Sequence, residues 1–265
     1  MDNFRFKKKF GQNFLKNANI IKKIVDCGNV EPESLIFEVG TGSGNLTLVL
    51  ADTYKDSKII TYEVDESLEV ILNNRFKEYN NIIVKFGDFL KVDLDKEVSN
   101  YSYNKLYFIS NVPYYITTPI LFKLIDSSLS FDKIIMMVQK EVGDRFCSSV
   151  SKKTYGALTV ILNYYFDIKK EFLVDRNQFV PKPNVDSVVV SFTKKAKLLP
   201  LYDEKVFIKL VHDSFKFKRK TLRNNLVNYN LDKVLEILNK YGFDLSVRAE
   251  NLSYDIFVEI SNNLV

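Results

Sequence analysis

Short apolar runs alternate with segments of helical spacing through most of the chain. Five runs are rich in branched and aromatic residues, which is typical of strands buried on both faces of a parallel sheet. They cover residues 35–39, 58–64, 82–86, 105–109 and 133–138. Between them, apolar residues recur at helical spacing, as in Leu68, Ile71 and Leu72. The alternation predicts a doubly wound, Rossmann-like α/β sheet.

Two further runs, 168–174 and 185–192, follow each other without a convincing helix between them. They predict an antiparallel hairpin that closes the edge of a seven-stranded sheet. Residues 193–200 carry three lysines and end in proline, which indicates a linker. After this linker, apolar residues recur only at helical spacing. We therefore expect a first domain over 1–197 and a small all-helical domain over 201–265.

The charge of the chain is small in total but uneven along the sequence. Its 265 residues are 46% hydrophobic and 27% charged, as in a globular protein, with a net charge of +5. Residues 1–30 hold seven Lys/Arg against two acids, 31–70 hold nine acids against two lysines, and 214–223 hold five Lys/Arg and no acid. This asymmetry suits a polyanion binder, although ordinary solvated faces explain it equally well.

Several classes of protein are excluded by what the sequence lacks. Two cysteines without paired spacing cannot form a disulfide framework or a structural zinc site, so we expect no metal. No apolar run approaches a membrane span, and the N-terminus lacks the apolar stretch of a secretory signal. We therefore expect a cytoplasmic protein without a membrane partner. The single histidine, His212, has no accompanying nucleophile motif, which argues against a His-based triad.

The first predicted strand runs into the glycine-rich segment Glu38-Val-Gly40-Thr-Gly42-Ser-Gly44. Glycines between a strand and a helix let the backbone approach a ligand closely. The spacing G-x-G-x-G differs from the dinucleotide pattern G-x-G-x-x-G. Together with the preceding acid, it suits a nucleoside-bearing ligand without a pyrophosphate.

Acids also end the next two predicted strands. Glu63 can accept hydrogen bonds from both hydroxyls of a ribose, while Asp88 and Phe89 can hold an adenine by its amino edge and its face. In order, the three strand ends therefore match the amino acid, ribose and base of S-adenosylmethionine. An NAD enzyme remains the alternative at this point.

The fourth predicted strand ends in Asn111-Val112-Pro113-Tyr114. The Asn111 side-chain carbonyl and the Val112 backbone carbonyl can each accept one N–H of an exocyclic amine, which localises the nitrogen lone pair. Tyr114 offers a face on which a base can stack. We expect this motif on a loop, with the next helix capped by Thr118 and started by Pro119. A proline-stopped loop with a buried tyrosine is the plain structural alternative.

From Phe10 to about Phe257, the chain resembles the ribosomal RNA adenine dimethyltransferase family, in particular its small-subunit branch. The resemblance begins with Phe10-Gly11-Gln12-Asn13-Phe14-Leu15 and includes Lys218-Arg219-Lys220-Thr221-Leu222-Arg223-Asn224. The other matching segments are 38–44, 111–119, 139–142, 155–158, 179–187 and 248–253, together with Glu63 and Asp88. Val112 stands where leucine or isoleucine is commoner. Tyr115 stands where many relatives have asparagine, so no catalytic role is expected of it.

The resemblance implies a methyltransferase sheet and S-adenosylmethionine-dependent N6-dimethylation of two adjacent adenosines near the 3′ end of small-subunit (16S) rRNA. The implied partner is the small ribosomal subunit, and we expect a monomer. Catalytic candidates are Asn111 and Tyr114. The cofactor-binding candidates are Asn13, Leu15, Gly40, Gly42, Glu63, Asp88 and Asn111.

The basic ends supply candidate RNA contacts. These are Lys7, Lys8, Lys9, Lys218, Arg219, Lys220, Arg223 and Arg248. Phe4, Phe6, Phe10, Phe215 and Phe217 are stacking candidates, although phenylalanines at this spacing are more often core residues.

Three alternatives remain open at the level of the sequence. One is the sister branch that methylates large-subunit (23S) rRNA and confers macrolide resistance, because it shares the site. A second is a DNA adenine methyltransferase with a similar Asn/Asp-Pro-Pro-Tyr loop. The third is a non-enzymatic nucleic-acid-binding factor on the same fold, which the intact set of Glu63, Asp88 and Asn111 disfavours.

Overall fold

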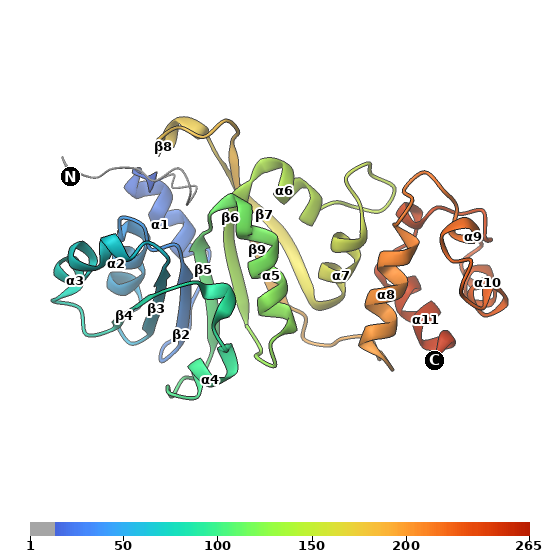
Figure 1. Ribbon diagram of the computed structural model, residues 1–265, viewed down its shortest axis with the longest axis horizontal. Helices are drawn as coiled ribbons and strands as arrows, with labels where there is room; N and C mark the ends of the chain where they lie inside the picture. Colours follow the sequence, from blue (N-terminus) through green and yellow to red (C-terminus); the bar gives the residue numbers. More distant parts are fainter. Residues whose placement is uncertain (1–13) are drawn as a thin grey trace. The chain divides into compact units, whose positions relative to one another are not determined.

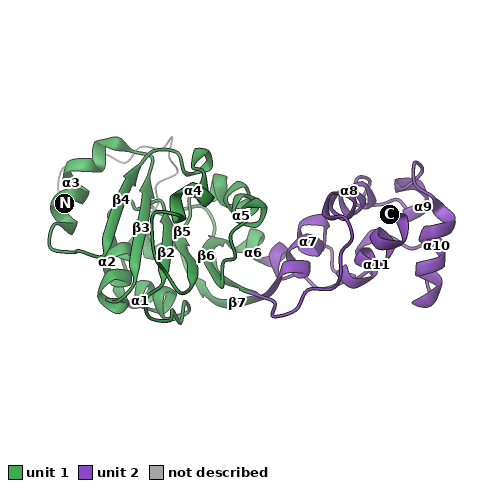
Figure 2. Cartoon of the chain, turned by 90° about the horizontal axis from the view of Figure 1, so that it is seen from below, with its two compact units in different colours: residues 1–143, 169–193 green, residues 144–168, 194–265 purple. Residues whose placement is uncertain are grey.

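A computed structural model of the chain describes residues 14–265. It contains two compact units (Figure 2). Unit 1 comprises the chain up to residue 143 together with 169–193, and unit 2 comprises 144–168 together with 194–265. Among the helices of the described part, none is long and apolar enough to cross a membrane.

A seven-stranded sheet forms the centre of unit 1 in the described residues (Figure 1). Its strands are β2 Leu35–Val39, β3 Lys58–Glu63, β4 Ile82–Phe86, β5 Leu106–Asn111, β6 Lys133–Gln139, β7 Phe166–Val174 and β9 Ser187–Lys194. Their order is β4-β3-β2-β5-β6-β9-β7. The first five are parallel, and β9 runs antiparallel to β6. The predicted Rossmann-like sheet, closed at one edge by a hairpin, is thus confirmed.

Helices cover both faces of this sheet (Figure 2). The helices are α1 Ala18–Asp26, α2 Asn45–Thr53, α3 Glu69–Phe76, α4 Leu94–Val98, α5 Thr117–Asp126 and α6 Lys140–Phe146. Figure 2 shows α1 and α2 on one side of the strands and α4 and α5 on the other. Ile36 and Ile59, which are paired in register, pack with α1 and α2. On the opposite face Phe37, Tyr62 and Phe89 form an aromatic cluster. Alternation along each strand thus separates two cores.

Two short strands lie outside the main sheet and were not predicted. β1 Phe14–Leu15 pairs antiparallel with β8 Phe179–Val180, with Leu15 opposite Phe179. Two residues are too few to show a strand period, so the sequence pattern could not indicate this pairing. It joins the N-terminal motif to a segment more than 160 residues away.

The start of α5 differs from the sequence prediction. Tyr114–Ile116 forms a single 3₁₀ turn, and α5 begins directly after it at Thr117, before the expected cap at Thr118. The Thr117 hydroxyl donates to the Tyr114 carbonyl at 3.2 Å. The reactive motif therefore leads into a tight helical turn, which fixes its backbone.

Unit 2 is helical. Its helices are α7 Ala157–Tyr165, α8 Glu204–Ser214, α9 Leu222–Asn225, α10 Leu231–Lys240 and α11 Tyr254–Leu264. Val160 and Ile161 of α7 share one core with Phe207 and Leu210 of α8. Residues 144–168, which the sequence assigned to the first domain, therefore pack with the C-terminal helices. A cut near residue 200 would uncover the apolar face of α7. The expected functions of the two domains stay predictions.

Phe257 of α11 tests this core. Its ring is fully buried and lies 5.9 Å from the ring of Phe215. Phe257→Ala should lower the free energy of unfolding of unit 2 by about 3–5 kcal/mol, because it leaves a cavity among packed side chains. Urea denaturation followed by circular dichroism measures the loss. Tyr202→Ala is the control, since Tyr202 is 73% exposed. Equal stability of the two variants would contradict the packing.

Candidate active site

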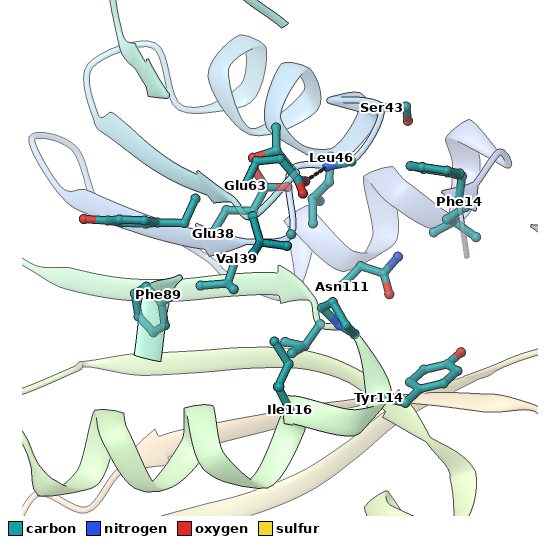
Figure 3. Close-up of a pocket in the computed structure, with 18 of the residues that line it drawn as sticks. Phe14, Glu38, Val39, Ser43, Leu46, Glu63, Phe89, Asn111, Tyr114 and Ile116 are labelled. Carbon is teal, nitrogen blue, oxygen red and sulfur yellow. Dashed lines mark hydrogen bonds between the residues drawn. The ribbon is translucent and has the colours of Figure 1, made fainter. Parts of the chain in front are cut away.

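The carboxyl ends of β2, β3 and β5 and the loop after β4 surround a cavity of about 430 Å³ in unit 1 (Figure 3). This volume is within the usual range for small-molecule sites. The lining includes seven of the residues predicted from the sequence, namely Leu15, Gly40, Gly42, Glu63, Asp88, Asn111 and Tyr114. Asn13 lies outside the described residues. Residues from five separate segments thus come together at one place.

The glycine-rich loop is confined on two sides. Gly40 and Gly42 have φ values of +85° and +55°, a region that side chains rarely adopt. A Cβ on Gly42 would lie 2.7 Å from a ring carbon of Phe14, and one on Gly40 would lie 3.1 Å from Cδ of Pro113. The loop therefore lies between β1 and the reactive motif; Gly42 has no room for a side chain, and at Gly40 a side chain would be tightly packed on a strained backbone.

Glu63 fixes the conformation of this loop. Its Oε2 accepts a hydrogen bond from the Gly42 backbone N–H at 2.8 Å, drawn in Figure 3, and its Oε1 accepts one from the Asp65 N–H at 2.9 Å. The side chain is buried, and burial raises the pKa of its carboxyl above the ordinary value. Each carboxylate oxygen has a second lone pair, so Glu63 can still accept hydrogen bonds from a ligand.

Glu38 is a second buried acid of the cavity wall. Its Oε2 accepts a hydrogen bond from the Thr47 hydroxyl at 2.6 Å. Burial raises the pKa of the Glu38 carboxyl from 4.5 to about 7, since few partners replace the lost water. This carboxyl therefore titrates closer to neutral pH than an ordinary glutamate does. A cationic ligand in the cavity would favour its charged form.

Asp88 and Tyr115 meet at the same wall. Asp88 is exposed and its Oδ1 accepts from the Leu90 N–H at 3.0 Å, so it caps a short 3₁₀ helix as well as lining the cavity. Tyr115 also lines the cavity and is 58% exposed. Its pKa is raised by burial and by the negative charges of Asp88 and Glu63, which places the phenol near both acids. The sequence argument expects no catalytic role of Tyr115, and did not indicate that it lines the cavity.

Asn111 and Tyr114 differ in how firmly they are held. Asn111 is the last residue of β5, and its side chain makes no hydrogen bond to any described residue. The Tyr114 hydroxyl shares a 2.6 Å hydrogen bond with the Ser187 hydroxyl of β9. Burial raises the pKa of Tyr114, so the phenol stays neutral at physiological pH. In this cavity the amide of Asn111 is therefore available to a ligand, whereas the ring of Tyr114 is held in place by its hydroxyl.

A chain of polar contacts behind the glycine-rich loop was not predicted from the sequence. Arg75 of α3 donates to the Ser43 carbonyl at 2.5 Å and to Asn45 Oδ1 at 2.8 Å. Asn45 Nδ2 in turn donates to the Leu15 carbonyl at 3.2 Å. These residues hold the glycine-rich loop against β1. Arg75 and Asn45 lie 30 residues apart in the sequence, as do Asn45 and Leu15, so no local sequence pattern indicates these contacts.

The predicted RNA contacts of unit 2 lie on two adjoining backbone segments. Lys218, Arg219, Lys220, Arg223 and Arg248 are all exposed. Backbone hydrogen bonds from Leu222 to Val247 at 2.8 Å and from Arg223 to Leu245 at 3.1 Å join the segments. Phe215 instead is partly buried and packs against the core of unit 2, on Tyr155 and Phe257. Lys7, Lys8 and Lys9, with Phe4, Phe6 and Phe10, lie outside the described residues. In residues 14–265, no group of three or more His, Cys, Asp or Glu side chains could hold a metal ion.

The raised pKa of Glu38 predicts a specific pH dependence. Its contribution to stability is complete below about pH 4.5, where the carboxyl is neutral in both states, and is lost as pH rises to about 7. Glu38→Gln stays neutral, so between pH 5 and pH 8 the free energy of unfolding of the wild type should fall by roughly 2–3 kcal/mol relative to that of Glu38→Gln. Urea titrations of the ligand-free proteins measure this difference. Glu78→Gln, at an exposed position, is the control. A difference that is independent of pH would contradict the assignment.

Comparisons with known proteins identify relatives of this chain. The chain is 39% identical over 270 residues to ribosomal RNA small subunit methyltransferase A of Streptococcus pneumoniae strain CGSP14, covering 98% of this chain and 92% of that protein. Strain P1031 has a relative of the same name that is 38% identical.

Solved structures resemble the fold over nearly the whole chain. A dimethyladenosine transferase from Plasmodium falciparum superposes with a TM-score of 0.77 at 26% identity, over 93% of this chain and 95% of that one. The 23S rRNA methyltransferase ErmE superposes with a TM-score of 0.74 at 23% identity, over 95% and 99%, which shows the fold alone. A family model for ribosomal RNA adenine dimethylase matches residues 3–265, and the chain belongs to this family.

Proposed function

We propose that this protein is an S-adenosylmethionine-dependent methyltransferase that dimethylates N6 of two adjacent adenosines near the 3′ end of small-subunit rRNA. Family membership and relatives of 38–39% identity named for the small subunit support the substrate. The observation that supports the chemistry is the position of the Asn111 amide. It makes no hydrogen bond to any described residue, and it lines the same cavity as Glu63 and Asp88.

The cavity residues fit the proposed cofactor by their chemistry. Two acids supply acceptors for the ribose hydroxyls and the adenine amino group, through Glu63 and Asp88. The loop at Gly40 and Gly42 leaves backbone, with no Cβ, where the amino-acid end would lie. When bound, S-adenosylmethionine supplies a methyl group on a positively charged sulfur. The buried acids of the wall suit a ligand of that charge, because a buried carboxylate is stabilised by a cation.

Chain groups activate the target amine by hydrogen bonding. The Asn111 side-chain carbonyl and the Val112 backbone carbonyl accept the two N6 hydrogens of adenine, which turns the nitrogen lone pair out of the ring. Pro113 contributes no competing N–H. Tyr114, anchored through Ser187, presents its ring to the base. Methylation of N6 would break the bond between the methyl group and sulfur, leaving a neutral thioether, and the proton that N6 loses would pass to water, so positioning and hydrogen bonding can carry the reaction without a titrating side chain.

Unit 2 is proposed to dock the RNA. Its exposed basic residues from 218 to 248 gather on adjoining segments and can contact phosphates without reading sequence. A monomeric, cytoplasmic protein is part of the same proposal. Of the alternatives, the large-subunit enzyme is disfavoured because the relatives of higher identity bear the small-subunit name.

Labelled-methyl transfer tests the function directly. The purified chain is given labelled S-adenosylmethionine with under-methylated small ribosomal subunits, large-subunit rRNA or duplex DNA. We expect label only in small-subunit rRNA, at adjacent adenosines recovered as dimethyladenosine. Label in large-subunit rRNA or DNA would support the corresponding alternative. Absence of both cofactor binding and transfer would support the non-enzymatic binder.

Asn111→Ala tests the chemical step. Removing the acceptor should lower kcat by roughly 10²-fold or more, since the hydrogen bond acts on the reacting amine. RNA affinity should hardly change. Asn111→Asp keeps an acceptor oxygen and should retain more activity than the alanine variant. Rates are measured at saturating cofactor, and a wild-type kcat in Asn111→Ala would refute the role.

A further inference from the structure

An exposed phenylalanine lies among cations in unit 2. Phe217 follows α8 and is 55% exposed, whereas Phe215, two residues earlier, is packed in the core. Lys216, Lys218, Arg219 and Lys220 flank Phe217 in the sequence, and all four are exposed. Lys216 Nζ lies 5.6 Å from the centre of the Phe217 ring. The ring therefore presents an apolar face inside a strongly basic segment.

The backbone that carries this ring is held in place. The Phe217 N–H donates to Asn225 Oδ1 at 3.1 Å, and its carbonyl accepts from Asn225 Nδ2 at 3.3 Å. The same carbonyl accepts from the Lys220 N–H at 2.8 Å, and Asn225 Nδ2 also bonds the Ser214 carbonyl at 2.7 Å. A single exposed apolar side chain is ordinary. Here the N–H and the carbonyl of Phe217 are both hydrogen-bonded, so the backbone that carries the exposed ring is fixed.

A second basic loop, which carries Lys152 and Lys153, adjoins the segment that carries Phe217. Lys152 and Lys153 are exposed, and the Lys153 carbonyl accepts a hydrogen bond from Lys218 Nζ. The Ser151 N–H donates to the Glu250 carbonyl at 2.8 Å, and the Ser151 hydroxyl accepts from Asn251 Nδ2 at 3.0 Å. These contacts bring lysines from two distant parts of the sequence together. The only described acid in this set of contacts, Glu250, is half-buried and contributes its backbone carbonyl.

We propose that Phe217 with Lys152, Lys153, Lys218, Arg219 and Lys220 forms a stacking platform for single-stranded RNA. The ring stacks on one unpaired base, while the cations contact the phosphates on either side of it. An aromatic face within a basic surface is the arrangement by which proteins bind single strands without sequence preference. The RNA partner rests on the proposed function. The platform itself belongs to unit 2 and takes no part in the methyl transfer.

The chain contains no tryptophan, so F217W introduces a unique fluorescent reporter. Titration of this full-length variant with a single-stranded oligoadenylate RNA should quench its emission, because a stacked base contacts the indole. Heparin, a polyanion without bases, should bind without comparable quenching. In the wild-type background, F217A should weaken oligoadenylate binding about 5- to 100-fold and leave heparin binding unchanged.

Matched variants separate stacking from charge. F217Y keeps an aromatic face and should bind RNA like the wild type, and Tyr202→Ala removes an exposed aromatic elsewhere in unit 2 without effect. The double variant K152A/K153A should weaken both RNA and heparin binding and reduce the salt slope by roughly 0.7 for each lost phosphate contact.

Wild-type RNA affinity in F217A, or unchanged F217W emission when RNA is bound, would overturn the platform. Equal loss of heparin and RNA binding in F217A would also overturn it and indicate a plain polyanion surface. Failure of the wild-type chain to transfer methyl groups to any RNA would instead overturn the proposed function. Methyl transfer can persist while the platform fails, so the two outcomes are distinguishable.

Discussion

The site depends on the absence of side chains at two positions of one loop. Gly40 lies against Pro113 and Gly42 against Phe14; a Cβ on Gly42 would overlap the Phe14 ring, and one on Gly40 would be in tight contact with Pro113. The loop can therefore contact the reactive motif on one side and β1 on the other. Glu63 holds the backbone of the loop by accepting a hydrogen bond from the Gly42 N–H. If the loop shifted, the acids and the reactive motif would no longer face the same cavity. A steric constraint on the backbone thus sets the geometry of the polar groups.

The residues of this site that could be predicted from the sequence are those at the ends of predicted strands. Glu63, Asp88 and Asn111 each end or follow a strand of the parallel part of the sheet, and parallel strands bring their carboxyl ends to one edge, so order along the chain predicts proximity. The relay from Arg75 through Asn45 to β1 could not be predicted, because it joins separate segments through side chains that are individually unremarkable in pattern. Sequence patterns specify which face is buried, but not which distant partner meets it.

The same distinction explains the second unit. The sequence analysis placed residues 144–168 in the first domain and could not indicate the core that α7 joins, because the partners of α7 lie more than 40 residues further on. Phe215 and Phe217 make the point at the scale of two residues. Both looked like candidates for stacking, and only the fold shows that one packs on Tyr155 while the other remains exposed. Periodicity could not separate them because the chain turns between α8 and α9 at this point.

Burial also explains how one chain can favour a cation and a polyanion in different places. In unit 1, Glu38 and Glu63 lie in a cavity where burial raises the pKa of each carboxyl, so their ionised forms gain most from a small cationic ligand that replaces water. A phosphate backbone gains nothing there, since it would be repelled by the same acids. In unit 2 the cations are exposed, and a polyanion that met such a surface would release the counterions condensed on its own phosphates, which favours a large polyanion over a small ion. The uneven charge of the sequence therefore becomes selective only when the fold buries the acids and leaves the bases at the surface.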